Sequence, residues 1–283
     1  MTRPVLANLD SRGVGSVTLN RPEVNNAYNG AMIEGLLEAM DELAGKPGLR
    51  VVLLKGNGKH FQAGADLKWI REVRDASAEE NERVSRATAE AVDRLNRLPV
   101  PTVALVQGGC FGGGTGMIAA CDVVIAADNA IFSIAEVRWG LTAAIIIPQL
   151  SDAISARQLR RYALSGERFD AVEACRIGLA HQVVPLDGLA AAGDAMVAQL
   201  LENGPDAIAE TKAWIQERLG RLRPRHLRRP EHQSRRQAAL RRGRRRPCLV
   251  RREASGQLAA PPVTRGVSSA GWYPVRKRPS KLA

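Results

Sequence analysis

Six glycines crowd the start of an apolar run in GGCFGGGTGMIAACD, residues 108–122. Glycine loses more conformational freedom on folding than any other residue, so this cluster needs a physical reason. One interpretation is a tight turn in which a helix packs closely on a strand. The other is that the missing side chains let a ligand reach the backbone. Amide N–H groups at a helix N-terminus would then point at an oxygen that becomes negative during a reaction.

A second loop of small residues favours the chemical interpretation. The stretch GKHFQAGADLKWI (58–70) places Ala63-Gly64-Ala65 directly before a predicted helix. Each loop follows a short apolar run, 49–56 or 101–108, that we interpret as a buried strand, and α/β folds bind ligands at loops after parallel strands. Two such loops could supply one amide each to a shared oxyanion. The glycine run matches neither GxxxxGK[ST] nor GxGxxG with a downstream acidic residue, which disfavours nucleotide binding of those types.

Few other side chains offer chemistry. His60 lies just before the second loop, where a structural role is the commoner one, and His181 sits in a turn with no partner visible in the sequence. No cluster of His, Cys and Asp has metal-ligand spacing, so we expect no metal. No GxSxG motif occurs, which disfavours a serine hydrolase. The cysteines show no CxxC pairing, and Cys110, Cys121 and Cys175 lie in apolar contexts typical of buried free thiols.

Alternating strand and helix signals surround the two loops. Runs rich in Val and Thr, or short and wholly apolar, predict strands, and apolar residues at helical spacing predict helices. The alternation indicates an α/β fold with parallel strands that are buried on both faces. Residues 151–220 have a mostly helical pattern. The expected strands are 14–22, 49–56, 101–108 and 121–128; the expected helices are 29–45 with Asn29 as N-cap, one from Asp66, 81–99, and a short one ending near Ala120.

The net charge of +12 is confined to one end of the chain. Residues 221–283 hold 19 of the 41 basic residues and 2 of the 29 acidic ones, which leaves a net charge of −5 for residues 1–220. The body is therefore a mildly acidic globular protein. Its longest uninterrupted apolar run, 143–148, is too short to span a bilayer, and residues 1–22 lack the apolar core of a signal peptide. We expect a cytoplasmic protein without a membrane partner.

At five places the chain resembles the crotonase, or enoyl-CoA hydratase/isomerase, family. The matching stretches occur in the family's order and spacing over residues 1 to about 220, and together they are highly specific. They are NRPEVNNAYN (20–29), HFQAGADL (60–67), VQGGCFGGGTGMIAACDVVIAAD (106–128), AIFSIAEVRWGL (130–141) and ALSGERFDAVEACRIGLAHQVVP (163–185). The resemblance implies a crotonase-like spiral of ββα turns over residues 1–150 as the acyl-CoA-binding core. It also implies a helical oligomerisation region over 151–220, in homotrimers or homohexamers.

The resemblance assigns the oxyanion donors as well. In such enzymes the amides come from the alanine of GAD and the central glycine of GGG, which are Ala65 and Gly113 here. The segment that continues through Asp66, Leu67 and Lys68 is similar to the stretch that contacts coenzyme A. Each donor in such a hole is commonly worth ~3 kcal/mol of transition-state stabilisation. The implied partner is an acyl-CoA thioester, and we expect no cofactor because coenzyme A is part of the substrate.

One glutamate is the candidate acid and base. Hydratases of the family typically carry two glutamates, and the second matches Glu136 in AEVRWG; a surface or N-capping glutamate is the alternative. The first position is Gly116, which has no acid to offer. The GGGxG pattern resembles a hydratase subset that includes some methylglutaconyl-CoA and isohexenylglutaconyl-CoA hydratases, and a single carboxylate also suits isomerases. Glu136 could take a proton from water and then deliver it to the α-carbon.

Three functions therefore stay open. The leading one is an enoyl-CoA hydratase, a lyase of fatty acid metabolism, with Glu136 as proton donor and acceptor. The second is a Δ3,Δ2-enoyl-CoA isomerase. The third is a catalytically impaired family member whose basic tail binds nucleic acid; it is the weakest, since the tail has two aromatic residues and no recognisable module. Residues 143–147 would make the acyl pocket apolar and suit a branched or bulky acyl group, although an ordinary core segment has the same pattern.

The tail, residues 221–283, fits none of these enzymes. Arginine clusters and scattered prolines begin abruptly after the amphipathic stretch IAETKAWIQERL (208–219). The stretch RGRRRPCLVRREASGQLA (242–259) can be encoded by codons whose reading one base later gives EAAEGLASFAEKRPASW, which resembles the usual end of these enzymes. We interpret 221–283 as a frame-shifted and poorly ordered tail. A genuine basic extension that binds RNA, DNA or acidic surfaces is the alternative.

Overall fold

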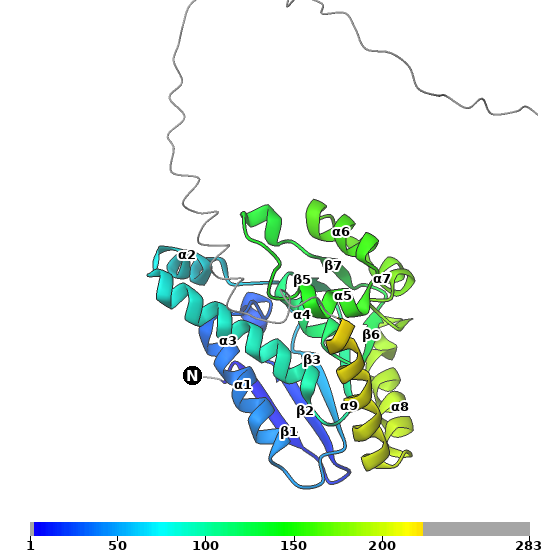
Figure 1. Cartoon of the computed structure of the whole chain (residues 1–283). Helices are drawn as coiled ribbons and strands as arrows, with labels where there is room; N and C mark the ends of the chain where they lie inside the picture. Colours follow the sequence, from blue (N-terminus) through cyan, green and yellow to red (C-terminus); the bar gives the residue numbers. More distant parts are fainter. Residues whose placement is uncertain (1–2, 223–283) are drawn as a thin grey trace, which may run out of the picture. The chain divides into compact units, whose positions relative to one another are not determined.

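Two β-sheets of unequal size carry the fold (Figure 1). The computed structural model describes residues 3–222. In the larger sheet the first pair is antiparallel and every later pair is parallel. Its strands lie in the order β1 (Val5–Leu9), β2 (Val14–Leu19), β3 (Val51–Gly56), β4 (Thr102–Val106), β6 (Val123–Ala127) and β9 (Gln182–Val184). The smaller sheet has the order β5 (Gly109–Phe111), β7 (Ile131–Ser133) and β8 (Phe169–Asp170).

Successive stretches of the chain alternate between the two sheets. The strand β4 of the large sheet leads directly into β5 of the small one, and after helix α4 (Gly113–Ala119) the strands β6 and β7 repeat this step. Two single-residue bridges continue the small layer into earlier parts of the chain, because Gln62 pairs with Cys110 and Tyr28 pairs with Ala65. The chain therefore winds as a spiral of ββα turns, and the predicted crotonase-like α/β fold is confirmed.

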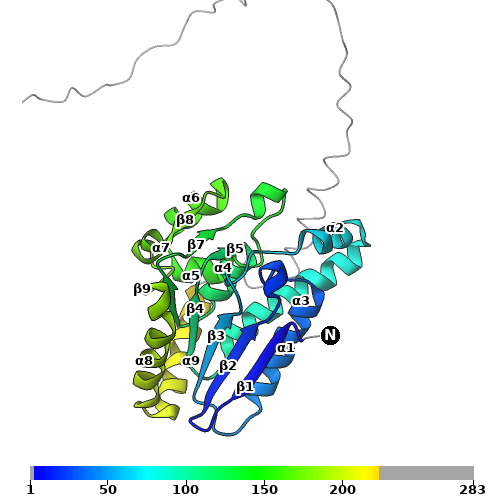
Figure 2. The ribbon, with the colours of Figure 1, turned by 180° about the vertical axis from the view of Figure 1, so that it is seen from behind.

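Helices cover both faces of the large sheet (Figure 1 and Figure 2). Helices α1 (Gly30–Ala44) and α3 (Ala78–Arg97) share one apolar core with residues of β2, β3 and β4. Helix α8 (Leu189–Leu201) packs against β4 and β6 on the other side, in a second core. Burial on both faces explains why these strands appear as continuous apolar runs in the sequence. The other helices are α2 (Leu67–Asp75), α5 (Ile147–Ala153), α6 (Ala156–Ser165), α7 (Ala171–Ile177) and α9 (Pro205–Leu222), with 3-10 turns η1 (Pro22–Val24), η2 (Glu136–Trp139) and η3 (Leu186–Gly188).

Side-chain caps set the starts of two helices near the small sheet. Asn29 caps α1 by accepting a hydrogen bond from the Met32 amide, as predicted, and Gly45 follows its last residue. Asp66 caps α2 by accepting a hydrogen bond from the Lys68 amide at 3.0 Å. Both caps satisfy amides that a helix cannot satisfy by itself, so the local sequence decides where these helices begin.

The structure corrects the predicted strands in detail. The three later strands predicted from apolar runs are β3, β4 and β6, all slightly shorter than expected. The strand expected over 14–22 ends at Leu19, and Pro22 begins η1 because its fixed φ suits a first helical position. The glycine stretch is not all loop, since its residues 109–111 form β5. A strand of three residues is too short to show the alternation on which the prediction depends.

A largely buried ion pair fixes α9 to the body. Lys212 is 8% exposed, and its Nζ lies 2.7 Å from Asp122 Oδ2 and 2.9 Å from the Val100 carbonyl oxygen. Asp122 also accepts hydrogen bonds from the amide and the hydroxyl of Thr102. Because Thr102 begins β4 and Asp122 directly precedes β6, this contact joins the last described helix to the centre of the large sheet.

Helices α5 to α9, with the short strands β8 and β9, make up the region predicted to be mostly helical, 151–220. Its role in oligomerisation and the domain boundary at residue 150, which lies inside α5, stay predictions. The tail interpretation falls on residues 221–283; apart from the end of α9, these lie outside the described residues.

We expect Lys212→Met to lower the free energy of unfolding by about 2 kcal/mol, because it leaves the Asp122 carboxylate without its cation. The loss is smaller than for a fully buried pair, since the Asp122 side chain is 35% exposed. Lys46→Met is the matched control: it removes a lysine from an exposed pair with Glu42, where about 0.5 kcal/mol or less is expected. Urea unfolding measures both; equal losses in the two variants would contradict the assignment.

Candidate active site

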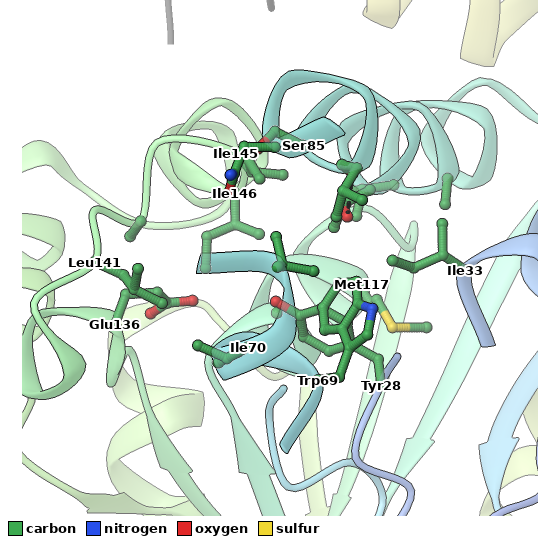
Figure 3. A pocket seen from close by; sticks show the side chains of 18 of the residues that line it. Tyr28, Ile33, Trp69, Ile70, Ser85, Met117, Glu136, Leu141, Ile145 and Ile146 are labelled. Atoms are coloured by element: carbon green, nitrogen blue, oxygen red, sulfur yellow. Dashed lines mark hydrogen bonds between the residues drawn. The ribbon is translucent and has the colours of Figure 1, made fainter. Parts of the chain in front are cut away.

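A cavity of about 720 Å³ opens between the small sheet and the helices beside it (Figure 3). Its walls come from α1, α2, α3, α4 and the segment from Glu136 to Ile146. Most of the lining is aliphatic or aromatic. In Figure 3, Glu136 lies at one end and Ile33 at the other, with Tyr28, Ile70 and Met117 between them. The site is thus a mainly apolar chamber with two carboxylates in its wall, Glu136 and Glu82, of which Glu82 is paired with Arg86.

Glu136 is the first residue of η2 and follows the small-sheet strand β7. Its side chain is half-buried, and Oε2 is shielded from solvent with no hydrogen-bond partner among the described residues. Burial raises the pKa of Glu136 to about 7, although a hydrogen bond from its own backbone amide opposes the shift. A carboxyl group with such a pKa exchanges a proton readily near neutral pH.

The backbone geometry concerns the two predicted oxyanion donors, the N–H groups of Ala65 and Gly113. In the parallel bridge between Tyr28 and Ala65, the Tyr28 amide bonds the Gly64 carbonyl and the Asp66 amide bonds the Tyr28 carbonyl. Such a bridge leaves the Ala65 N–H pointing away from Tyr28. Gly113 begins α4, and the first amides of a helix have no partner within that helix.

Two glycines at the start of α4 are required by their neighbours. Gly112 has φ +52°, and a Cβ there would lie 3.1 Å from Glu136 Oε1. At Gly113 a Cβ would lie 2.7 Å from Tyr28 Cε1, closer than real Cβ atoms come. Glu136 and Tyr28 therefore contact adjacent glycines. The close-packing interpretation of the glycine run is supported at these two positions, and the ligand-approach interpretation stays a prediction.

The space beside Gly116 is already filled. A Cβ at Gly116 would lie 2.1 Å from Ile146 Cγ2 and 2.5 Å from Ile146 Cβ. A glutamate at this position, as in the two-carboxylate pattern, would collide with Ile146, which is 3% exposed. The chain therefore replaces a second carboxylate by an aliphatic wall.

The structure separates the predicted site residues into two groups. Gly113 and Glu136 line the cavity, whereas Ala65, Asp66 and the next two residues are not in its lining. Asp66 caps α2 and lies 3.3 Å from the Arg21 guanidinium. Leu67 and Lys68 are exposed at the start of α2. Asp66, Leu67 and Lys68 therefore lie outside the chamber, at the N-terminal end of α2, and later residues of this helix line the chamber.

His60 and His181 both accept hydrogen bonds from backbone amides. His60 Nδ1 accepts a hydrogen bond from the Gly109 amide at 2.8 Å, and His181 Nδ1 accepts one from the Val124 amide at 3.0 Å. Burial lowers the pKa of His60, which favours the neutral ring that can accept this bond. Each histidine thus joins a loop to a strand, and the structural interpretation of His60 is supported.

Sequence reasoning missed Tyr28 and Gln62, which both line the cavity. Gln62 is fully buried; its Oε1 accepts the Gly64 amide at 2.9 Å, and its Nε2 has no partner among the described residues. Burial, and secondarily the nearby Glu136 charge, raise the pKa of Tyr28 above its ordinary value. Tyr28 could have been found from its place in the motif NNAYN. An analysis of apolar periodicity, however, assigns a tyrosine at this position to the core.

The α/β spiral thus places a largely buried carboxylate beside the first residues of a helix. The family model described as "Enoyl-CoA hydratase/isomerase" matches residues 10–236. The hydroxycinnamoyl-CoA hydratase-lyase of Pseudomonas fluorescens is 34% identical over 204 residues, which cover 71% of this chain and 74% of that protein. A Delta(3,5)-Delta(2,4)-dienoyl-CoA isomerase of Dictyostelium discoideum is 29% identical, covering 73% and 74%.

A solved structure, an enoyl-CoA hydratase/isomerase from Xanthobacter autotrophicus Py2, superimposes with a TM-score of 0.77 at 30% identity, covering 84% of this chain and 87% of that one. The chain belongs to the enoyl-CoA hydratase/isomerase family. Within residues 3–222, no three His, Cys, Asp or Glu side chains are grouped to hold a metal ion. In the same part of the chain, no helix has the length and apolar character needed to cross a membrane.

Glu136→Gln should change stability in a pH-dependent way. Since burial raises the Glu136 pKa from 4.5 to about 7, the folded state carries a penalty for the ionised form above pH 7 and none below pH 4.5. We therefore expect the variant to gain up to about 3 kcal/mol over the wild type between pH 4.5 and pH 8. Glu38→Gln, at an exposed position of α1, is the control. Urea unfolding at both pH values measures the difference; a constant difference would contradict the buried carboxylate.

Gly116→Ala should destabilise the protein by about 2–3 kcal/mol, because its Cβ overlaps Ile146. Ile146→Gly removes the overlapping atoms, so the double variant should be less destabilised than the sum of the two single variants. Gly45→Ala, where the nearest atom lies 3.5 Å from the added Cβ, is the control. Additive losses in urea unfolding would show that the two positions do not compete for space.

Proposed function

We propose that this enzyme is an enoyl-CoA hydratase, which adds water across the 2,3 double bond of an acyl-CoA thioester. One observation carries the proposal: Glu136 lines the cavity beside the first residues of α4, and its Oε2 is buried without a hydrogen-bond partner among residues 3–222. With a pKa of about 7, this group can hold or release a proton at neutral pH. It is thereby suited to take a proton and return it within one turnover.

The reaction is then balanced with a single carboxylate. Ionised Glu136 removes one proton from water while the water oxygen bonds C3. The electron pair of the double bond moves to the thioester oxygen, where the amides of Ala65 and Gly113 donate to the developing negative charge. Protonated Glu136 next delivers its proton to C2 as the carbonyl re-forms. The orientation of the Ala65 N–H and the unpaired helix start at Gly113 support this assignment.

A Δ3,Δ2-enoyl-CoA isomerase is the second candidate. The filled space beside Gly116 leaves no room for a second carboxylate at that position, and Glu136 alone suffices to carry a proton between two carbons of the substrate. The GGGxG pattern that suggests a methylglutaconyl-CoA-type hydratase stays a hypothesis. A catalytically impaired member with a nucleic-acid-binding tail depends on residues outside the described part.

The substrate should carry an apolar acyl group. Ala143, Ile145 and Ile146 line the cavity together with aliphatic residues of α1, α2 and α3, which supports the prediction of a branched or bulky acyl chain. Asp66, Leu67 and Lys68 would meet coenzyme A at the start of α2. Coenzyme A enters as part of the substrate, and the proposed chemistry uses no further cofactor.

Assembly into trimers or hexamers in the cytoplasm is part of the proposal. Several large apolar side chains of the C-terminal region are exposed, which suits subunit contacts. They are Leu164, Val172, Trp214 and Ile215.

The direct test is loss of enoyl absorbance with a panel of 2-enoyl-CoA thioesters. We expect kcat/KM to rise with pH through about 7, because Glu136 must be ionised to accept the proton of water. Glu136→Gln is nearly isosteric but takes no proton, so at least about a hundredfold loss is expected. Glu38→Gln should keep the wild-type rate. Full activity of Glu136→Gln would refute the assignment, and double-bond migration in 3-enoyl-CoA without hydration would favour the isomerase.

A further inference from the structure

A water molecule that adds to a double bond must be held as well as deprotonated. It has two hydrogens, and the transfer to Glu136 uses only one of them. The position where the family resemblance expects a second acid is Gly116, and Ile146 occupies the space beside it. The second hydrogen of the water therefore needs another acceptor in the cavity wall.

Tyr28 is a polar group of the cavity wall that can supply this acceptor. Its ring edge lies over the first turn of α4: Cε1 is 2.7 Å, and Cζ, which bears the hydroxyl, is 3.4 Å from the Cβ position of Gly113. Glu136 Oε1 is 3.1 Å from the Cβ position of the adjacent Gly112. Tyr28 and Glu136 thus flank the same peptide, and Figure 3 shows both in the wall of the same chamber.

The ring of Tyr28 is held in place from two sides. It packs edge-on against Trp69, with the ring centroids 5.6 Å apart. Its backbone is bonded to Gly64 and Asp66 on the oxyanion loop. Since backbone and ring are both fixed, the hydroxyl has a defined position in the cavity wall. Tyr28 and Glu136 both line this cavity, and a water between two polar groups of one cavity wall can bridge them.

Three other polar side chains in the lining are less suitable. Gln62 uses its Oε1 for the Gly64 amide, so that only its donor Nε2 is without a partner among the described residues. Thr88 donates to the Val84 carbonyl, and Glu82 is paired with Arg86; all four lie on α3. By contrast, the pKa of Tyr28 is raised by burial and by Glu136, so its hydroxyl stays neutral and leaves the proton transfer to Glu136.

We propose that the Tyr28 hydroxyl holds the reacting water, its oxygen accepting the water hydrogen that is not transferred to Glu136. The inference rests on the proposed hydratase function. The bond changes are those given above: the water oxygen bonds C3, one proton passes to Glu136 and then to C2, and the second hydrogen stays on the product hydroxyl. Tyr28 neither gains nor loses a proton, and serves where a second carboxylate is missing.

The test compares two reactions of the full chain carrying Tyr28→Phe, which keeps the ring. Hydration of a 2-enoyl-CoA should fall about tenfold in kcat with KM changed less than about twofold, as for the loss of one hydrogen bond in the reacting complex. Exchange of the C2 hydrogen of a saturated acyl-CoA in D₂O needs Glu136 and the oxyanion amides but no attacking water. That exchange rate should stay within about twofold of wild type.

Tyr162→Phe is the matched control, because Tyr162 bonds Glu173 away from the cavity and its variant should keep both rates. Equal losses of hydration and exchange in Tyr28→Phe would overturn the proposal, since the hydroxyl would then act on Glu136 or on packing. Unchanged hydration would overturn it as well, and so would a variant that no longer folds. Absence of hydration in the wild type would instead overturn the hydratase function, and this inference with it.

Discussion

The buried side chain of Asn26 holds the site loops in their relative positions. Its Nδ2 donates to the carbonyl oxygens of Asn57, His60 and Phe61 at 2.9 to 3.2 Å, and its Oδ1 accepts from the Arg21 amide at 2.8 Å. Asn26 also adopts φ +55°, a conformation that asparagine tolerates better than most residues. One side chain thereby joins the first turn of the spiral to the loop of the second, and Tyr28 follows two residues later.

The same construction repeats in the next turns, and it explains why the site residues come from distant parts of the sequence. Tyr28 bridges Ala65, Gln62 bridges Cys110, and Gly113 and Glu136 follow β5 and β7 of the small sheet. Successive turns of the spiral thus bring Tyr28, Gln62, Gly113 and Glu136 to the same chamber, either in a small-sheet bridge or shortly after a small-sheet strand. Since successive turns touch backbone to backbone, side chains at the contacts must be small, which accounts for the glycines.

Burial of Glu136 in the chamber lowers the stability of the folded protein, and the same burial gives the carboxylate a pKa suited to proton transfer. An apolar wall penalises the ionised carboxylate, and this penalty is also what brings its pKa to about 7. Ile146 strengthens the effect, because it fills the space that a second carboxylate would occupy. A single proton-transferring group in an apolar chamber suits both the hydratase and the isomerase chemistry of the family, and the neutral hydroxyl of Tyr28 is what would favour the addition of water.

The sequence by itself determined the central elements and the family resemblance. Apolar runs and helical spacing predicted β3, β4, β6 and α1, and the motifs around Ala65, Gly113 and Glu136 named the candidate site. Only the tertiary structure decided which groups share a cavity. The pairing of the three-residue strand β5 with β7, the contact of Tyr28 with Gly113, and the packing of Ile146 beside Gly116 all join residues that are far apart in the chain. Periodicity reports local burial, whereas these contacts depend on how successive turns of the spiral stack.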